Sequence, residues 1–406
     1  MEKKPQKATD QSIGPKSHIV SLVRCEDYGR EMVFSSVSRA IDLLGGIGAF
    51  VQPGMRVLVK PNILQASAPE AMVCTHPDVI YSVCKILKEH GCHVILAESP
   101  GAGSVYGPAQ LKKAYEKTGY TQFADELGIE LNYDVSYEEV PNPEGRFIKR
   151  FSIIKPAREA DAIVVVSKLK THLLTEMTAA TKNLFGLIPG YEKASFHGRL
   201  PDPLDFSRML VDLNELIRPT LQVMDAVIAM EGDGPSSGEP RKVGAILASS
   251  SYAAIDVVAA RVIGIPPMDI PTVKVAVERG LLSKELEGID VRGERIGSFE
   301  IKDFKLPSTY ASGERKKSGF VTRNMMKMMR AYALRPVVLR ERCTACGDCV
   351  RACPVQMVQI HRGKAKVDHS KCIRCYACHE MCTVQAITLR RSFGGKVAAK
   401  LVERRG

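Results

Sequence analysis

The stretch Cys343-Thr-Ala-Cys346-Gly-Asp-Cys349-Val-Arg-Ala-Cys353-Pro354 stands near the end of the chain, and its cysteine spacing returns from Cys372 to Cys382. Each run has two two-residue gaps followed by one three-residue gap. The short gaps bring three thiolates to the corners of one site, and the longer gap puts the fourth on the next helical turn, pointing toward the other site. The repeat therefore predicts a pair of coupled thiolate sites.

This twin run resembles that of bacterial-type two-cluster ferredoxins, which hold two [4Fe-4S] clusters. Structural zinc and disulfides are the alternative interpretations, but zinc gives no reason to repeat an eight-cysteine run, and nothing here resembles a secreted chain. Thr383 stands where the pattern would place a second proline. The resemblance assigns cluster I to Cys343, Cys346, Cys349 and Cys382, and cluster II to Cys372, Cys375, Cys378 and Cys353.

The overall composition is that of a globular protein with a basic charge balance. The 406 residues include 57 Lys and Arg against 45 Asp and Glu, a formal net charge of +12. This length predicts two or three domains. The charge suits an acidic redox protein such as a ferredoxin or flavodoxin, an anionic small molecule, or nucleic acid. The chain shows no helix-turn-helix and no interleaving of aromatic and basic residues, which argues against nucleic acid.

The remaining cysteines and the apolar segments point to a reducing compartment. Four cysteines stand outside the twin run, and those at positions 84 and 92 lie in apolar contexts typical of buried thiols. The first ten residues are polar and show no apolar core of a signal peptide. The most apolar long stretch, residues 245–267, contains Asp256 and Arg261 and is not expected to span a membrane. We therefore expect a cytoplasmic protein, oxygen-sensitive and suited to anaerobic conditions.

The chain before residue 308 alternates apolar runs with helical patterns, which is typical of βαβ units in a parallel sheet. A turn at 142–145 predicts a hairpin. The predicted first helix starts at Ser35 or Ser36 and ends at Gly45. The predicted strands cover residues 18–24, 56–60, 92–97, 161–167, 221–226 and 243–248. The other predicted helices cover residues 75–91, 108–117, 176–187, 204–217, 253–262 and 272–279.

The predicted fold is an α/β body with a parallel sheet, in two lobes, followed by an α+β ferredoxin-like domain that binds two clusters. The polar stretch 308–318 and a methionine-rich basic helix at 324–334 separate the two parts. That helix is expected to pack the small domain onto the body or, alternatively, to dock on a membrane or partner. The predicted divisions are a disordered N-terminus at 1–17, the body at 18–307 with lobes 18–155 and 156–307, a linker at 308–336, the ferredoxin domain at 337–390 and a basic tail at 391–406.

Polar side chains concentrate where the predicted strands end, and ligands of parallel sheets bind at the carboxyl ends of strands. Lysines at such ends suit an anionic ligand, and a histidine there can exchange protons or bind a metal. A glycine loop at 101–107 and a tight turn at 231–235 are weaker signals, because turn formation alone explains them. The loop lacks the dinucleotide fingerprint, and the chain has no Walker loop. The candidate catalytic residues are His172, Lys170 and Lys182, and the candidate ligand-binding residues are Lys60, Asn62, Glu98, Lys168, Asn183 and Glu231.

Several of these residues stand in short motifs that resemble one family. The motifs are Lys60-Pro-Asn62, Thr75-His-Pro77, Lys168-Leu-Lys-Thr-His172, Lys182-Asn-Leu-Phe-Gly186 and Glu231-Gly-Asp-Gly-Pro235. Together with the twin cysteine run they are similar to the domain of unknown function 362 family, many members of which end in a ferredoxin module. The resemblance spans roughly residues 17–301 and implies the site residues above, but no settled reaction.

The sequence favours an oxidoreductase in which two [4Fe-4S] clusters pass electrons to an anionic ligand at the strand ends of the α/β body, with His172 exchanging protons. One alternative is a non-catalytic electron-transfer or maturation protein, whose body is a docking module for a redox partner. Another is an iron–sulfur sensor whose basic tail contacts nucleic acid. Mutation of Lys170 or His172 to Ala separates the first hypothesis from the other two, because it should abolish ligand binding and leave the clusters intact only if the protein is an enzyme.

Overall fold

A computed structural model describes residues 18–101, 106–190, 192–299, 301–310, 335–374 and 376–390. The predictions for the N-terminus, the methionine-rich helix, the basic tail and the ligand Cys375 lie outside these ranges, as does most of the glycine loop. Within them, no helix is both long and apolar enough to cross a membrane.

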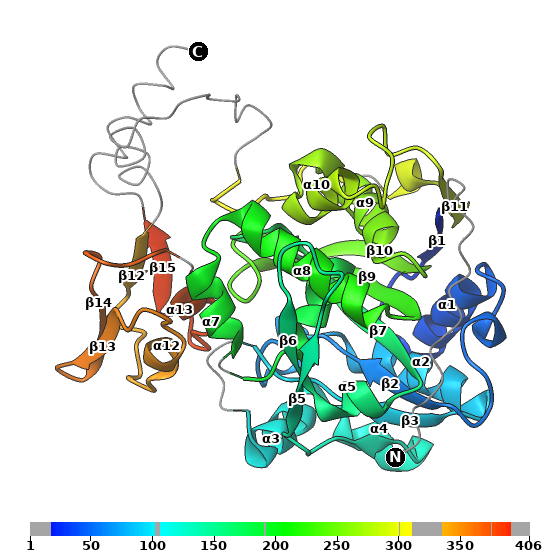
Figure 1. Cartoon of the computed structure of the whole chain (residues 1–406), viewed down its shortest axis with the longest axis horizontal. Helices are drawn as coiled ribbons and strands as arrows, with labels where there is room; N and C mark the ends of the chain where they lie inside the picture. The colour runs from blue at the N-terminus through cyan, green and yellow to red at the C-terminus, as the bar shows by residue number, and fades with distance from the viewer. Residues whose placement is uncertain are drawn as a thin grey trace.

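A nine-stranded sheet forms the centre of the described α/β body (Figure 1). Its order is β11-β1-β10-β9-β7-β2-β3-β4, and β8 pairs with β7 at the side. Strands from both predicted lobes therefore join one sheet. The strands are β1 (His18–Arg24), β2 (Arg56–Lys60), β3 (His93–Leu96), β4 (Glu130–Leu131), β7 (Ala162–His172), β8 (Glu176–Thr178), β9 (Leu221–Glu231), β10 (Glu239–Ser249) and β11 (Ile289–Gly293).

The sheet is mostly parallel, which confirms the predicted class, but one part of it is antiparallel. β10 pairs antiparallel with both β9 and β1. The physical reason is the short connection at residues 232–238, because a parallel pair needs a crossover of a dozen or more residues whereas an antiparallel pair does not. The sequence analysis recognised the turn at these residues without deriving the reversal from it.

Helices cover both faces of the sheet, and the alternation of side chains along β2 shows how. Val57 and Val59 pack into the core beneath α1 and α2, whereas Leu58 packs into the core on the opposite face. Two cores lie on that opposite face, one around α9 and α10 and one around α8. The helices are α1 (Arg30–Asp42), α2 (Pro77–Glu89), α3 (Pro108–Thr118), α4 (Thr121–Leu127), α5 (Lys155–Glu159), α6 (Ala180–Asn183), α7 (Glu192–Arg199), α8 (Pro203–Ile217), α9 (Tyr252–Val262) and α10 (Pro271–Glu278).

Several predicted elements differ from the structure, including β9 and β10, which are longer than predicted, whereas the predicted hairpin does not differ. α1 begins at Arg30 after Gly29, so neither Ser35 nor Ser36 is its cap. The single helix predicted at 176–187 is instead β8, α6 and a 3₁₀ turn. β7 continues to His172 because β8 pairs with its last residues. The hairpin is confirmed as β5 (Tyr137–Pro141) and β6 (Arg150–Ile154).

The C-terminal module is a small α+β unit with two short pairs of antiparallel strands, which confirms the predicted class. β12 (Arg335–Val338) pairs with β15 (Ile387–Arg390), and β13 (Val358–His361) pairs with β14 (Lys364–Val367). α12 (Asp348–Arg351) and α13 (Ala377–Glu380) each follow the first cysteines of a run. In Figure 1 the module lies beside α7 of the body. A Cβ at Gly198 of α7 would lie 2.7 Å from Pro354, so the two parts touch there.

Candidate functional site

The cysteines of the twin run line two cavities in the C-terminal module. One, of about 310 Å³, is lined by the cysteines assigned to cluster I, and the module's apolar side chains close it. The other, also about 310 Å³, is lined by three of the four cysteines assigned to cluster II. The fourth, Cys375, lies outside the described residues. The first cavity contains Cys343, Cys346, Cys349 and Cys382, and the second contains Cys353, Cys372 and Cys378.

The backbone around these cavities suits iron–sulfur clusters. The N–H groups of Ala365, Met357 and Ala386 donate to cysteine sulfurs at 3.3, 3.1 and 3.0 Å. Such hydrogen bonds stabilise the negative charge that cluster-bound thiolates carry. The last cysteine of each run lines the cavity of the other run. Cys382 lies with the first three cysteines of the first run, and Cys353 lies with the cysteines of the second run. The residues present therefore fit two [4Fe-4S] clusters.

A second candidate site lies in the body, where β2 and β3 end. Lys60 is buried, and its Nζ donates to Glu98 Oε2 at 2.5 Å, to Pro61 O at 2.7 Å and to Asn183 Oδ1 at 3.1 Å. Burial lowers the pKa of Lys60 and raises the pKa of Glu98, and the mutual attraction opposes both shifts. Burial thus favours the neutral partners, whereas the attraction between the two groups favours the ion pair.

This pair lines a cavity that we name the Lys60 pocket. Gly186 forms part of its wall, and a Cβ there would overlap Glu98 Oε1 and lie 2.7 Å from Lys60 Nζ. Glycine is therefore required for the close approach of this segment to the buried pair. The polar residues lining the pocket are Lys60, Asn62, Glu98, Ser99, Thr178, Lys182, Asn183, Lys193 and His197.

Five buried atoms of residues that line the Lys60 pocket have no hydrogen-bond partner. They are the acceptors Glu98 Oε1 and Asn62 Oδ1, the donor Asn183 Nδ2, the hydroxyl oxygen Thr178 Oγ1, and His197 Nδ1. A buried polar group without a partner costs on the order of 1–3 kcal/mol, and such groups are rare in folded proteins. Their convergence on one cavity indicates a site prepared for a polar ligand.

Two residues of the pocket come from α7 and were missed as site residues by the sequence analysis. Lys193 Nζ donates to Ser99 Oγ and Ile188 O, both at 2.6 Å. Burial lowers the pKa of Lys193 to about 7 and that of His197 to about 3. His197, which the sequence analysis left without an assigned role, also stacks on Phe206. No strand precedes α7, so the strand-end argument had no reason to select either residue.

α9 holds the segment that carries Lys182 and Asn183. The carboxylate of Asp256 accepts from the backbone N–H groups of Ala180 and Thr181 at 2.8 and 3.1 Å. Burial raises the pKa of Asp256 to about 6. Asp256 therefore anchors the start of α6, which in turn places its last two residues in the Lys60 pocket.

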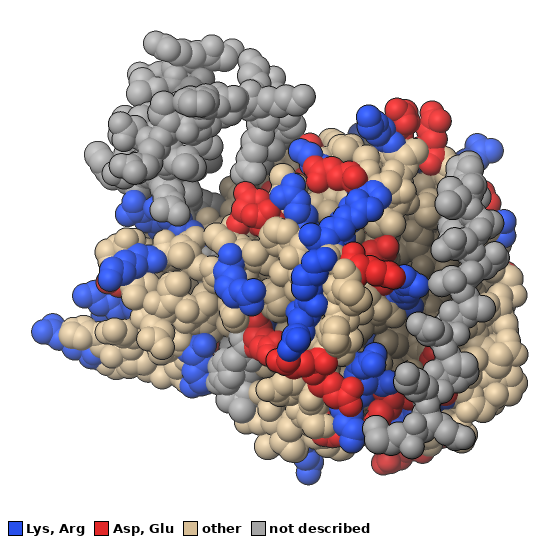
Figure 2. Space-filling view, in the orientation of Figure 1, with Lys and Arg blue, Asp and Glu red and all other residues tan. Residues whose placement is uncertain are grey.

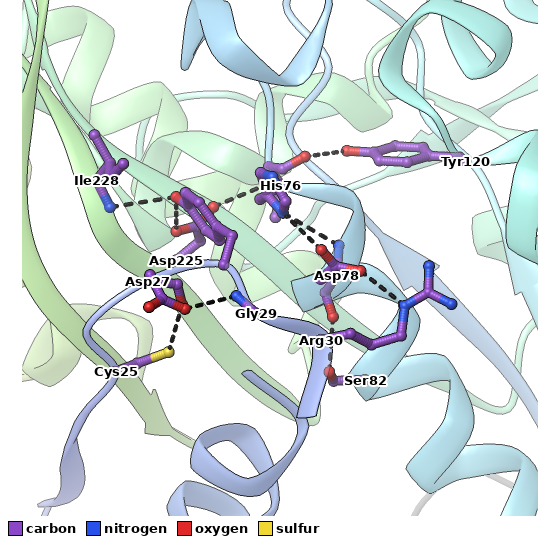
Figure 3. Close-up of polar contacts among 12 residues, drawn as sticks. Cys25, Asp27, Gly29, Arg30, His76, Asp78, Ser82, Tyr120, Asp225 and Ile228 are labelled. Carbon is purple, nitrogen blue, oxygen red and sulfur yellow. Dashed lines mark hydrogen bonds and ion pairs between the residues drawn. The ribbon is translucent and has the colours of Figure 1, made fainter. Parts of the chain in front are cut away.

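Lys168 belongs to a different cluster, on the opposite face of the sheet. Figure 3 shows the part of this cluster around Asp225 and His76. Its Nζ donates to Asp225 Oδ2 at 2.9 Å and to the hydroxyl of Tyr28 at 2.6 Å. Tyr28 in turn donates to Asp225 Oδ1 at 2.8 Å and stacks on His76, with 3.6 Å between ring centroids. The backbone N–H groups of His76 and Val227 also donate to Asp225. The structure thus separates Lys168 from Lys60, although the sequence analysis placed both in one crevice.

Lys170, His172 and Glu231 do not line the Lys60 pocket. Lys170 Nζ donates to Val73 O at 2.5 Å. His172 Nδ1 accepts from the N–H groups of Leu174 and Thr175, and burial, with Lys182 as the next cause, lowers its pKa well below the ordinary value. The predicted proton exchange by His172 therefore conflicts with an imidazole held neutral. Glu231 instead accepts from the backbone of Lys305.

Comparisons with known proteins agree with the two-part organisation. A family model described as a domain of unknown function (DUF362) matches residues 57–261, and a 4Fe-4S dicluster domain matches residues 335–383. The second match favours iron–sulfur clusters over zinc and gives the module the capacity for electron transfer. A thylakoid-associated protein of Synechocystis sp. is 34% identical over 269 residues, which are 64% of this chain and 79% of that protein.

Two solved structures show weak likenesses. The lactate racemase apoprotein of Thermoanaerobacterium thermosaccharolyticum aligns with a TM-score of 0.40 and 15% identity over 61% of this chain. A protein of Thermotoga maritima aligns with a TM-score of 0.33 and 14% identity over 51% of this chain. The chain spans 57% and 52% of those two structures. At these scores neither likeness bears on the function.

Proposed function

Because the chain belongs to the domain of unknown function 362 family and ends in a 4Fe-4S dicluster domain, we propose that it is an iron–sulfur oxidoreductase. Its ligand binds in the Lys60 pocket of the body, residues 18–307, and its electrons arrive through the ferredoxin domain, residues 337–390. The bound clusters supply single electrons. The chain supplies the binding, the electrostatics and the protons.

Helix α7 is the observation that carries this proposal. Lys193 and His197 of α7 line the Lys60 pocket. The next residue, Gly198, lies against Pro354, which directly follows the cluster ligand Cys353. One short helix therefore contacts both the ligand pocket and the loop of cluster II. This arrangement supports an electron route from cluster II to the pocket.

The charges and unsatisfied atoms of the pocket define the class of ligand. Lys182 and Lys193 favour an anion such as a carboxylate or phosphate. Glu98 Oε1 and Asn62 Oδ1 are acceptors without partners, so the ligand must also offer hydroxyl or amino donors. A small hydroxy- or amino-carboxylate satisfies both requirements, whereas a fully deprotonated anion without donors leaves the acceptors unpaired.

Protons for the reduced ligand come, in this proposal, from Lys193 and from the Lys60–Glu98 pair. Lys193 has a pKa of about 7 because of its burial, so it can hold or release a proton near neutral pH. The Lys60–Glu98 pair, joined by a hydrogen bond of 2.5 Å, supplies a further proton inside the pocket. His172, whose pKa lies well below its ordinary value, has no such role in this proposal.

The test is anaerobic purification of the full chain, followed by iron counting and calorimetry with inorganic phosphate, simple carboxylates, and hydroxy- and amino-carboxylates. About eight iron atoms per chain are expected from two clusters. At least one donor-bearing anion should bind and be turned over by the reduced protein. Binding without turnover, or intact reducible clusters with no ligand from the panel, would favour the non-catalytic electron-transfer or maturation protein.

The role of α7 is tested by Gly198→Val. The added side chain should displace Pro354 and slow electron delivery to the bound ligand, while ligand affinity and cluster reduction by dithionite stay unchanged. Gly297→Val is the matched control, because a Cβ there meets no atom within 4 Å. Equal turnover in the two variants would remove α7 from the route.

A further inference from the structure

The outer side of the cluster I cavity exposes apolar groups to solvent. Ile360 and Val384 are 44% and 38% exposed, Cys346 is exposed, and all three line this one cavity. Most of the large apolar side chains in the described ranges are buried. We name Cys346, Ile360 and Val384 the cluster I face. Its exposed apolar groups adjoin a group of metal ligands, as an electron-entry surface requires.

Two basic side chains lie beside the cluster I face. Lys364 Nζ donates to Cys343 O at 2.7 Å, and Arg351 donates to Cys346 O at 3.4 Å and also pairs with Asp348, which lines the same cavity. Residues 335–390 contain ten Lys or Arg and four Asp or Glu. Figure 2 shows the module displaying Lys and Arg with almost no Asp or Glu on the face in view. This charge complements an acidic partner.

The two clusters differ in what covers them. The loop of cluster II contacts the body, since Pro354 lies against Gly198 of α7. Gln385, beside the cluster I cavity, also contacts the body, because its Nε2 donates to Ser236 O at 3.5 Å. The cluster I face instead carries exposed ligand and apolar side chains. An external donor therefore reaches cluster I directly, and cluster II is the one that adjoins the Lys60 pocket.

We propose that an acidic electron-carrier protein, of the flavodoxin or ferredoxin class, docks on the cluster I face. One electron leaves the reduced carrier, which is oxidised by one electron, and enters the cluster held by Cys343, Cys346, Cys349 and Cys382. No covalent bond forms or breaks in this step. The inference rests on the proposed iron–sulfur role but not on the identity of the pocket ligand. An anionic membrane would also meet the basic charge, but it gives no reason for apolar side chains to adjoin a cluster ligand.

The experiment measures reduction of the full, cluster-loaded chain by reduced flavodoxin in an anaerobic stopped-flow instrument, without pocket ligand. Raising the salt concentration should lower the second-order rate constant about tenfold, since steering by opposite charges is screened. Ile360→Glu should lower it about tenfold at low salt, because it adds repulsion and removes apolar contact. Met268→Glu is the matched control, because Met268 is a similarly exposed apolar residue on the body, 40% exposed.

Electron paramagnetic resonance of the dithionite-reduced variants checks that both clusters are intact, and calorimetry with oxidised flavodoxin measures docking without electron transfer. Equal rate constants for Ile360→Glu and Met268→Glu would overturn the proposal, as would a rate independent of salt. Binding of the chain to phosphatidylserine vesicles that Ile360→Glu abolishes, with an unchanged flavodoxin rate, would assign the face to a membrane instead. A failed proposed function would show itself differently, as normal flavodoxin reduction without ligand turnover.

Discussion

Two buried lysine–carboxylate pairs stand in this sheet, Lys60–Glu98 and Lys168–Asp225, and they differ in how completely their hydrogen bonds are satisfied. Asp225 is bonded through both oxygens, by Lys168, by Tyr28 and by backbone N–H groups. Glu98 is bonded through Oε2 alone, and its Oε1 is buried without a partner beside a cavity. We name Lys168–Asp225 the closed pair, because both carboxylate oxygens have partners within the protein. We name Lys60–Glu98 the open pair, because one carboxylate oxygen has none.

This difference separates a structural role from a binding role more clearly than residue type does. Both pairs place a lysine on a strand of the parallel part of the sheet, and burial lowers the pKa of both lysines. A saturated network stabilises one conformation of the fold. An unsaturated one carries an energetic cost that a ligand can remove. The Lys60 pocket therefore remains our candidate for chemistry, and the Lys168 cluster becomes a candidate for stability.

The largest expected effect comes from breaking the closed pair. Asp225→Asn leaves the Lys168 ammonium buried without its counterion, so we expect a loss of about 3–5 kcal/mol in the free energy of unfolding. Glu98→Gln is the matched change in the open pair. It should cost only about 1–2 kcal/mol, since Lys60 keeps its bonds to Pro61 and Asn183. Anaerobic urea denaturation measures both, and equal losses would contradict the distinction.

The second effect concerns the affinity of the Lys60 pocket for its ligand. Lys182 lines the Lys60 pocket and is half-buried, so Lys182→Ala should weaken binding of an anionic ligand about ten- to hundredfold, the cost of a lost charged hydrogen bond. Stability should change little. Calorimetry with the anion selected from the panel measures the affinity, and Lys274→Ala, at an exposed position on α10, controls for net charge. Equal affinities in the two variants would exclude Lys182 from the ligand site.

The sequence was sufficient to predict the open pair because its residues follow local rules. Lys60 and Glu98 come at the ends of two strands with clear apolar patterns, and neighbouring parallel strands end at the same edge. Their meeting in space followed from that pattern alone. The cluster ligands could be predicted in the same way, because the spacing of the cysteines within each run determines where their thiolates lie.

The closed pair and the α7 residues depended on non-local contacts. β7 extends past Ser167 because β8 pairs with it, and its pairing with β9 shifts register between Lys168 and Lys170. Strand alternation puts Lys168 on the face of Val164 and Val166, opposite Lys60, but its partners Tyr28 and Asp225 come from distant segments of the chain. Lys193 reaches the pocket only because α7 folds back across the strand ends. No periodicity within one segment predicts such placements.

The third effect is a pH dependence of ligand binding, which we expect to come from Lys193. Because burial holds its pKa near 7, Lys193 is cationic below that pH, and an anionic ligand should bind about five- to tenfold more tightly at pH 6 than at pH 8.5. Calorimetry across this range measures the profile. Lys193→Gln should remove the dependence of affinity on pH. An unchanged profile in that variant would assign the pH dependence to the Lys60–Glu98 pair instead.

Lys193 should also make the free energy of unfolding depend on pH, in the direction opposite to that of ligand affinity. The folded pKa, about 7, lies below the ordinary lysine value of 10.5, so the unfolded chain binds more protons between these values. Without ligand, the Lys193 contribution to stability therefore rises with pH across this window. Comparing urea denaturation of the wild type and Lys193→Gln at both ends of the window isolates it.

The smallest expected effect is that of Tyr28→Phe in the closed pair. The change removes the hydroxyl that bridges Lys168 and Asp225 but leaves their direct 2.9 Å bond and the stacking surface against His76. We expect a loss of about 1 kcal/mol in the free energy of unfolding, typical of one hydrogen bond. Affinity for the pocket ligand should not change, because Tyr28 lies on the opposite face of the sheet. A large loss of ligand binding with normal stability would instead show that the closed pair also takes part in the chemistry.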